Sequence, residues 1–254
     1  MNYSAVDINI DNTPASVLSI EKLETKKKDE IEPNPNHHII PKHPARVLIN
    51  GASGSGKTNM IINLLTKDLF YKGYFNAIYL FSASYFMDDI WQNLKLPENM
   101  VNDGFSESIL SKIIKLQEDM IEKYGVDKCP KLLFIFDDCI DDNTYYRSKS
   151  LKTLFTRGRH LNASVWFSTQ EYVAVPPKLR KQMSDIIVFE PTNNQELDRI
   201  ASENAYKLKI KDFSKLIMEV TKKPYSFMVI RKGKNIKPNE RYLTNFDAYI
   251  KIGP

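Results

Sequence analysis

Residues 51–58 read GASGSGKT and combine three glycines with a lysine and a threonine, directly after an apolar run. The order fits the phosphate-loop pattern G-x-x-x-x-G-K-[ST], whose glycines let successive backbone N–H groups turn toward phosphate oxygens. Lys57 is predicted to reach the β- and γ-phosphates of a nucleoside triphosphate, and the Thr58 hydroxyl to ligate magnesium. A chance glycine-rich turn is the alternative, which the position between a predicted strand and a predicted helix disfavours. The predicted nucleotide-binding residues are Gly51, Ala52, Ser53, Gly54, Ser55, Gly56, Lys57 and Thr58.

A second candidate group is a pair of acids at the end of the apolar run 131–136. Asp137 and Asp138 follow this run, and a buried strand of a parallel sheet presents its last carboxylates at the edge where a phosphate loop also lies. We expect Asp137 to hold magnesium, directly or through water, and Asp138 to orient a water near the γ-phosphate. Adjacent acids also begin many loops, so the assignment of this pair to magnesium and water depends on the phosphate loop upstream.

A third group surrounds the predicted strand 164–169. Gln170 follows this strand, so its amide is placed to hydrogen-bond both the γ-phosphate and the attacking water and to sense which nucleotide is bound. A polar cap at the strand end is the alternative. Arg157 and Arg159 precede the same strand, too far from their own nucleotide to serve it. They fit either an arginine finger for a neighbouring subunit or the capped end of a helix, and the sequence leaves both open.

The elements that must position these residues follow from the hydrophobic pattern. Strands are predicted at 45–50, 77–83, 131–136, 164–169, 185–191 and 225–233. Helices are predicted at 58–69, 84–94, 107–124 and around 143–156. Apolar strands that alternate with helices predict an α/β fold, in which a mostly parallel sheet has helices on both faces. Strand 77–83 is expected to lie between the loop strand and the acidic strand. This insertion favours the phosphate-loop proteins that activate water over simple nucleotide kinases, whose acidic strand usually neighbours the loop strand.

Length and composition predict one core domain with appendages, because 254 residues with 42% hydrophobic residues resemble an ordinary soluble protein. The predicted organisation is a tail at 1–44, partly disordered or packed on a neighbour, an ATPase core at 45–206, and a basic extension at 207–254 that completes or flanks the core. No apolar run is long enough to span a bilayer, and no secretory signal is recognised. The two cysteines are expected to be reduced thiols of an intracellular protein rather than a disulfide.

Basic residues are concentrated near the C-terminus, where 207–241 holds eleven Lys or Arg against three acidic residues, in a chain of net charge +5. The cluster indicates either a polyanionic partner or a solvated lysine-rich face, and charge alone leaves both open. The candidate contacts for a polyanion such as DNA are Arg231, Lys232, Lys234 and Lys237 in this segment, and Lys178, Arg180 and Lys181 after the predicted strand 164–169.

Three segments together resemble a known family: GASGSGKT, LLFIFDDC and RGRHLNASVWFSTQ, in this order and spacing. They are similar to the poxvirus-type genome-packaging ATPases of large DNA viruses and virophages, within the FtsK/HerA superfamily of DNA translocases. The resemblance covers roughly residues 45–191. It implies a phosphate-loop NTPase with a RecA/FtsK/HerA-like ASCE core, which forms a homo-oligomeric ring and uses ATP and Mg²⁺ to pump double-stranded DNA into a preformed capsid.

The resemblance also assigns roles to single residues. Lys57 and Thr58 correspond to the phosphate-loop residues, and Asp137 to the magnesium carboxylate. Asp138 corresponds to the acid that activates water, Gln170 to the sensor, and Arg159 to the arginine that the family places before the sensor strand. Many members of the superfamily carry Glu where this chain has Asp138, which is one methylene shorter and leaves the position of the water less defined.

Several functions compete with viral genome packaging. A cellular or plasmid HerA/FtsK-like DNA pump is the alternative within the superfamily. A nucleotide-dependent switch is a further alternative, and it is weakened because no guanine-reading N-K-x-D motif occurs. A small-molecule phosphotransferase is disfavoured by the strand between the loop and the acids and by Gln170. For the packaging function, the expected partners are double-stranded DNA, further copies of the chain and capsid vertex proteins. The expected location is the host cytoplasm, the virus factory or the virion.

Overall fold

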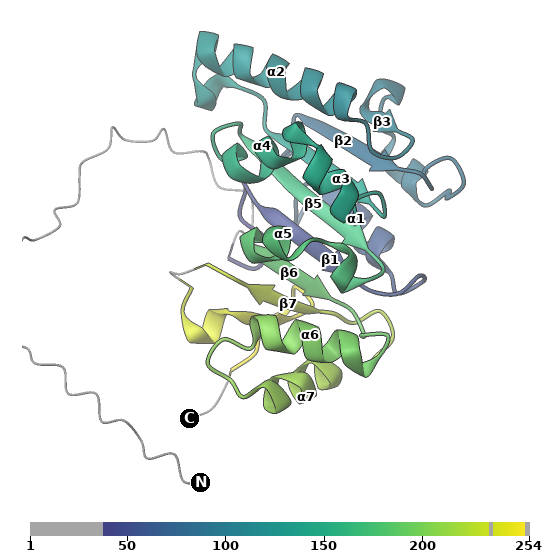
Figure 1. Cartoon of the computed structure of the whole chain (residues 1–254), viewed down its shortest axis with the longest axis vertical. Coiled ribbons are helices and arrows are strands. Elements are labelled where there is room, and N and C mark those ends of the chain that lie inside the picture. Colours follow the sequence, from purple (N-terminus) through teal and green to yellow (C-terminus); the bar gives the residue numbers. More distant parts are fainter. Residues whose placement is uncertain (1–37, 234–235, 252–254) are drawn as a thin grey trace, which may run out of the picture. The chain divides into compact units, whose positions relative to one another are not determined.

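The structure is a computed structural model that describes residues 38–233 and 236–251 (Figure 1). In these residues a single sheet has the strand order β3-β2-β4-β5-β1-β6-β7-β8-β9. The strands are β1 Arg46–Asn50, β2 Ala77–Ser82, β3 Val101–Asn102, β4 Leu132–Asp137, β5 Ala163–Thr169, β6 Asp185–Val188, β7 Met228–Arg231, β8 Tyr242–Thr244 and β9 Ala248–Tyr249. The pairs from β3 to β6 are all parallel, and those from β6 to β9 are antiparallel. The mostly parallel α/β sheet predicted from the sequence is therefore confirmed.

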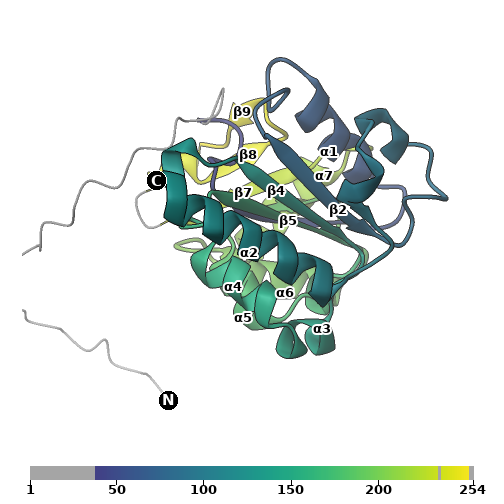
Figure 2. The same cartoon turned by 90° about the horizontal axis from the view of Figure 1, so that it is seen from above.

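The helices cover both faces of the sheet. They are α1 Lys57–Thr66, α2 Glu107–Tyr124, α3 Asp142–Arg147, α4 Lys149–Arg157, α5 Pro177–Gln182, α6 Asn194–Asn204 and α7 Ile210–Thr221. Side chains of β1 alternate between two cores, because Leu48 packs with α2 and α4 to α7, whereas Val47 and Ile49 pack with α1. Figure 2 shows α2, α4 and α6 on one side of the strands and α1 on the other.

The strand that separates the phosphate loop from the acids is not the one expected. β5 lies between β1 and β4 in the sheet, whereas β2 lies on the far side of β4. The interpretation of 77–83 as the separating strand is therefore wrong. A strand does separate the two motifs, but it is the strand that leads to Gln170, which places that residue between the loop and the acids.

Two expected helices differ from the structure. Residues 84–94 form turns and a short 3-10 helix, Trp91–Leu94, because the Asp88 carboxylate accepts from the Ile90 N–H and holds the backbone in a local turn. The helix around 143–156 is divided at Ser148, whose side chain caps α4 by accepting from the Leu151 N–H at 2.8 Å. The Ser148 hydroxyl also donates to Glu107 at the start of α2, which ties the division to the neighbouring helix.

The ends of the described chain are joined to the core. Ile40 is fully buried, and β7, β8 and β9 extend the sheet beyond β6. Of the predicted tail 1–44, residues 1–37 lie outside the described residues, as does the candidate Lys234. Ile40 and His43 are buried, so the folded part begins before residue 45. Cys129 and Cys139 are free thiols. Within residues 38–233 and 236–251, no helix combines the length and the apolar character needed to cross a membrane.

His43 fastens the segment before β1 to the start of β5. Its Nε2 lies 2.8 Å from Asn162 Oδ1, which can only accept, so Nε2 carries the proton. Its Nδ1 lies 2.7 Å from Ser164 Oγ, which donates to it and accepts from the Ala45 N–H. These contacts fit a neutral imidazole. Burial lowers the pKa of His43 to about 4, with the Asn162 hydrogen bond opposing and the Lys131 charge assisting the shift.

This histidine should make the folded state sensitive to acid. The unfolded chain takes up the proton near pH 6.5 and the folded chain only near pH 4, so the free energy of unfolding should fall as the pH drops through that range. The slope from one such group is at most about 1.4 kcal/mol per pH unit. Urea unfolding of the parent and of His43→Gln from pH 4 to 7 measures it. The His43→Gln protein should be less stable at pH 7 and show a smaller slope; equal slopes would exclude His43 as the acid-sensitive group.

Candidate nucleotide-binding and catalytic site

The carboxyl ends of β1, β5 and β4 bring three predicted motifs to one edge of the sheet. The Gly51 N–H donates to Thr169 O at 3.2 Å, which ties the phosphate loop to the end of β5. The Asp138 N–H donates to Ser168 O at 2.9 Å, which ties the acidic pair to the same strand. Residues from distant parts of the sequence therefore share one backbone hydrogen-bond framework.

The glycines of the phosphate loop are required by its geometry. Gly54 and Gly56 have φ of 74° and 100°, a region that side chains disfavour, and Gly56 caps α1 at its N-terminus. A Cβ on Gly51 would lie 2.7 Å from the Phe189 Cβ, so the loop also needs glycine where it packs on the end of β6. The loop thus directs backbone N–H groups and the positive end of α1 at the same space.

Lys57 lies folded against its own loop. Its Nζ donates to Gly51 O at 2.6 Å and to Ala52 O at 3.0 Å. Burial lowers the pKa of Lys57, and the charges of Asp138 and Asp137 oppose that shift. The ammonium is therefore close to both acids at the edge of the sheet, as the sequence predicts for a group that meets the outer phosphates.

Asp137 is a buried carboxylate at the end of β4. Burial raises its pKa and the neighbouring Asp138 charge raises it further, whereas the Ser168 and Ser82 side chains and the Lys57 charge oppose the shift. Ser82 Oγ donates to Asp137 Oδ2 at 3.1 Å, and Ser84 Oγ lies 3.5 Å from the same atom. Neither Ser82 nor Ser84 was predicted from the sequence. The signal was available, because Ser82 ends the apolar strand β2 and so reaches the same edge.

Asp138 and Gln170 are hydrogen-bonded to each other at two points. The Gln170 N–H donates to Asp138 Oδ1 at 3.0 Å, and Gln170 Nε2 donates to Asp138 Oδ2 at 2.9 Å. Asp138 has a φ of 47°, in the left-handed region where Asp is one of the better-tolerated residues. The structure thus brings together the acid expected to activate water and the residue expected to sense phosphate, and both are exposed.

Glu196 at the start of α6 joins several segments at this edge and was not predicted from the sequence. Burial would raise its pKa, but hydrogen bonds from the Tyr172 and Thr192 N–H groups bring the pKa below the usual value. Its Oε1 also accepts from Asn50 Nδ2 at 3.1 Å, so one carboxylate links the end of β1 to the segment after Gln170. The signal is Asn193 three residues before Glu196, a helix-capping pattern in which the Glu196 N–H donates to Asn193 Oδ1 at 2.9 Å.

The two candidate finger arginines lie at the opposite edge of the sheet, before β5 begins. Arg157 pairs with Glu118 of α2 at 2.9 Å. Arg159 is exposed, and no acidic side chain in the described part of the chain forms an ion pair with it. Between them, Gly158 is closely packed, since a Cβ there would lie 2.6 Å from Leu154 O. β5 separates Arg159 from Gln170 by roughly 20 Å at ~3.3 Å per residue, so Arg159 cannot reach the phosphate loop of its own chain.

Three candidate DNA-binding residues point into the protein instead. Arg180 is 3% exposed and forms an ion pair with Glu203 at 2.7 Å, so its prediction as a DNA contact is wrong. Lys232 Nζ donates to Arg180 O at 2.9 Å, and burial lowers its pKa. The guanidinium of Arg231 lies 4.0 Å from the buried Asp185 carboxylate. Lys232 and Arg231 therefore also make contacts within the folded protein. Lys178, Lys181 and Lys237 remain exposed, with Lys237 3.6 Å from Glu240.

The donor set can hold magnesium only together with a bound nucleotide. Within the described residues, no cluster of three or more His, Cys, Asp or Glu side chains could hold a metal alone. Magnesium at nucleotide sites is commonly bound by one or two carboxylates, phosphate oxygens and water, and the Asp137 carboxylate and the Thr58 hydroxyl at the start of α1 are oxygen ligands of that kind. The buried Asp137 carboxylate, which lies among hydroxyl groups at 3.1 to 3.5 Å, fits this requirement.

Comparison with solved structures supports the fold. The chain is similar to B204, described as the DNA-packaging ATPase from Sulfolobus turreted icosahedral virus, with a TM-score of 0.51, 18% identity, and coverage of 74% of this chain and 92% of that one. It is also similar to EssC (ATPases 2 and 3) from Geobacillus thermodenitrificans, with a TM-score of 0.51, 16% identity, and coverage of 80% and 39%. These likenesses confirm the predicted ATPase core fold.

Relatives by sequence occur in large DNA viruses. The uncharacterized protein 075L of Invertebrate iridescent virus 6 is 26% identical over 156 residues, which is 61% of this chain and 58% of that protein. The uncharacterized protein 015R of Frog virus 3 is 26% identical over 148 residues, 58% of this chain and 44% of that protein. The chain thus spans about half the length of these two relatives.

The family comparison covers the whole candidate site. The family model described as Poxvirus A32 protein matches residues 35–241, which include the phosphate loop, the acidic pair and the sensor strand. The resemblance predicted from those three motifs is confirmed. The chain belongs to the poxvirus A32 protein family.

Proposed function

We propose that this protein is an ATPase that uses the energy of ATP hydrolysis to move double-stranded DNA into a viral capsid. The observation that carries the proposal is the convergence of Lys57, Asp137, Asp138 and Gln170 on one edge of the sheet. Family membership and the similarity to B204, itself described as a DNA-packaging ATPase, support the genome-packaging role. A cellular or plasmid DNA pump is the alternative within the superfamily. A nucleotide switch is the alternative that the DNA-stimulation experiment below separates from the proposal.

The proposed chemistry assigns one task to each side chain. The loop N–H groups and Lys57 bind and orient the phosphates, and Lys57 exchanges its contacts with Gly51 O and Ala52 O for phosphate oxygens. Asp138 accepts a proton from the attacking water, and Gln170 orients Asp138 and the γ-phosphate. Asp137 and Thr58 would hold magnesium, which when bound neutralises charge on the phosphates. The remaining partners, also proposed, are further copies of the chain in a ring and capsid vertex proteins, in the host cytoplasm, the virus factory or the virion.

The DNA contacts are assigned to the exposed lysines of α5. Lys178 and Lys181 lie on the helix that follows the Gln170 segment, and Glu196 ties that segment to the phosphate-loop strand. A motor that moves DNA of any sequence should contact the phosphate backbone, so its affinity should depend steeply on salt.

The DNA assignment gives a measurable expectation. Double-stranded DNA should stimulate ATP hydrolysis by the parent protein. Replacing Lys178 and Lys181 together by Gln should weaken DNA binding equally for unrelated sequences, because phosphate contacts carry no sequence information. The slope of log affinity against log salt should flatten by about 0.9 for each DNA phosphate that the variant no longer neutralises. Fluorescence anisotropy with two unrelated duplexes at several salt concentrations gives both quantities.

The matched control is Lys112→Gln with Lys115→Gln, because these lysines are exposed on α2. The control should bind DNA like the parent. An unchanged salt slope in the α5 variant would place the DNA path elsewhere, whereas ATP hydrolysis indifferent to DNA in the parent would favour the nucleotide switch.

A further inference from the structure

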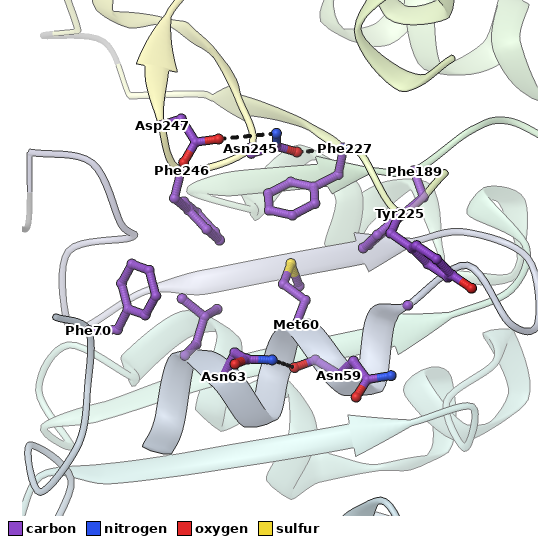
Figure 3. Close-up of a pocket in the computed structure, with 12 residues that line it drawn as sticks. Asn59, Met60, Asn63, Phe70, Phe189, Tyr225, Phe227, Asn245, Phe246 and Asp247 are labelled. Atoms are coloured by element: carbon purple, nitrogen blue, oxygen red, sulfur yellow. Dashed lines mark hydrogen bonds between the residues drawn. The ribbon is translucent and has the colours of Figure 1, made fainter. Parts of the chain in front are cut away.

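A cavity of about 460 Å³ begins where the phosphate loop ends (Figure 3). Its volume is within the usual range for small-molecule sites. Its lining includes Gly56 and Asn59, which flank the lysine and threonine of the loop. The cavity lies between α1 and the segments before β7 and after β8 (Figure 3). The remaining lining residues are Met60, Asn63, Leu64, Phe70, Phe189, Tyr225, Phe227, Asn245, Phe246 and Asp247.

Tyr225 lines the cavity beside the phosphate loop and has an unusual backbone conformation. Its φ is 65°, in the left-handed region that bulky residues rarely adopt, although its side chain is 72% exposed. The Tyr225 ring approaches the loop closely, since a Cβ on Gly56 would lie 3.2 Å from the Tyr225 Cδ1. Bulky residues held in the left-handed conformation cluster at binding sites. The ring is thus held against the loop without the burial that normally explains such a conformation.

The polar side chains of the cavity are largely occupied by bonds within the protein. Asn63 Nδ2 donates to Asn59 O at 2.8 Å. Asn245 Oδ1 accepts from the Phe227 N–H at 3.1 Å, and Asn245 Nδ2 donates to Asp247 at 3.3 Å. What remains toward the cavity is mainly apolar and aromatic, from Met60 and the phenylalanines (Figure 3). Such a surface binds a flat aromatic ring by stacking rather than by reading its edge.

We propose that this cavity binds the nucleoside of the triphosphate whose phosphates lie in the loop, and that Tyr225 stacks on the base. The inference rests on the proposed function, because it requires a nucleotide in the phosphate loop. Stacking on an aromatic ring tolerates any base but favours the larger ring system. The site should therefore accept adenine and guanine nucleotides alike and bind pyrimidine nucleotides more weakly.

The test compares a ligand that has a base with one that has none. Dissociation constants for ATP, GTP, CTP and inorganic triphosphate would be measured by calorimetry with magnesium, for the parent, Tyr225→Ala and Tyr225→Phe. Tyr225→Ala should bind ATP about 10-fold more weakly, the effect expected from removing one stacking partner of the base, and should bind triphosphate as the parent does. Tyr225→Phe keeps the ring and should bind both ligands like the parent.

Tyr225→Asn is the control for a loss of stability, because Asn removes the ring but tolerates the left-handed conformation. This variant should melt no lower than the parent and still bind ATP more weakly. Three results would each overturn the stacking proposal. Tyr225→Ala could bind ATP like the parent, or it could lose affinity equally for ATP and triphosphate. The third is a parent protein that binds ATP and CTP with equal affinity. A parent that binds neither ATP nor triphosphate would instead overturn the proposed function itself.

Discussion

Replacing Asp138 by Asn should lower the rate of ATP hydrolysis at least about a hundredfold while nucleotide affinity stays near that of the parent. The reason is chemical, because an amide has nearly the shape of a carboxylate but cannot accept the proton of the attacking water. Asn also tolerates the left-handed backbone at this position, where φ is 47°, so the loop should keep its conformation. Steady-state hydrolysis and equilibrium nucleotide binding, measured on the same preparation, separate the two effects.

Lys57→Ala is the matched comparison, because it removes the cation of the loop rather than the base. It should abolish hydrolysis and also weaken nucleotide binding, since Lys57 is the loop residue whose charge meets the outer phosphates. Hydrolysis by Asp138→Asn at close to the parent rate would remove Asp138 from the mechanism. Glu171 and Asp137 would then be the acids to examine at this edge.

Arg159→Ala should reduce hydrolysis by about a thousandfold or more if Arg159 completes the site of a neighbouring subunit, which is the usual worth of an arginine finger. The structure gives the geometric reason: Arg159 lies at the edge of the sheet opposite the phosphate loop. Mixing Arg159→Ala with Lys57→Ala subunits should restore part of the activity, because an intact loop on one subunit can meet an intact arginine on the other. Hydrolysis measured across mixing ratios, with assembly followed by light scattering, tests this.

Arg157→Ala provides the control for the same turn. Arg157 already pairs with Glu118 within its own chain, in an exposed ion pair of the kind that contributes only about 0–1 kcal/mol. Its replacement should leave hydrolysis within a few-fold of the parent. Absence of rescue at every mixing ratio, with assembly intact, would give Arg159 a structural role. A larger effect of Arg157→Ala than of Arg159→Ala would exchange the two assignments.

The meeting of the three motifs at one edge of the sheet could be predicted from the sequence because each motif is local. Lys57, Asp137 and Gln170 each follow or end a short apolar run, and parallel strands bring such ends together regardless of what lies between them. The amphipathic helix over 107–124 was predicted at the bounds observed for α2. Its period of three and four residues is strong, and Ser106 caps its start by accepting from the Ile109 N–H.

What the sequence could not predict depends on contacts between distant residues. Strand order is one example, since β5 lies between β1 and β4 because of hydrogen bonds between strands that are distant along the chain. The charge pattern near Arg180 is another, because counting basic residues cannot show that Glu203 neutralises Arg180 inside the protein. Helices α6 and α7 were not assigned, although the Asn193 and Glu196 capping pattern marks where α6 begins.

One strand connects the two ends of the proposed mechanism. β5 has Arg159 shortly before its start and Gln170 directly after its end, all seven of its residues are buried, and it is hydrogen-bonded to β1 on one side and β4 on the other. A strand paired on both sides cannot slide past its neighbours, so it moves only together with β1 and β4 as one rigid unit. In a ring of such subunits, a shift of Gln170 caused by one nucleotide would also shift Arg159 at the other end of the strand, next to the nucleotide of the neighbouring subunit. ATP hydrolysis in successive subunits would then be coupled through this strand.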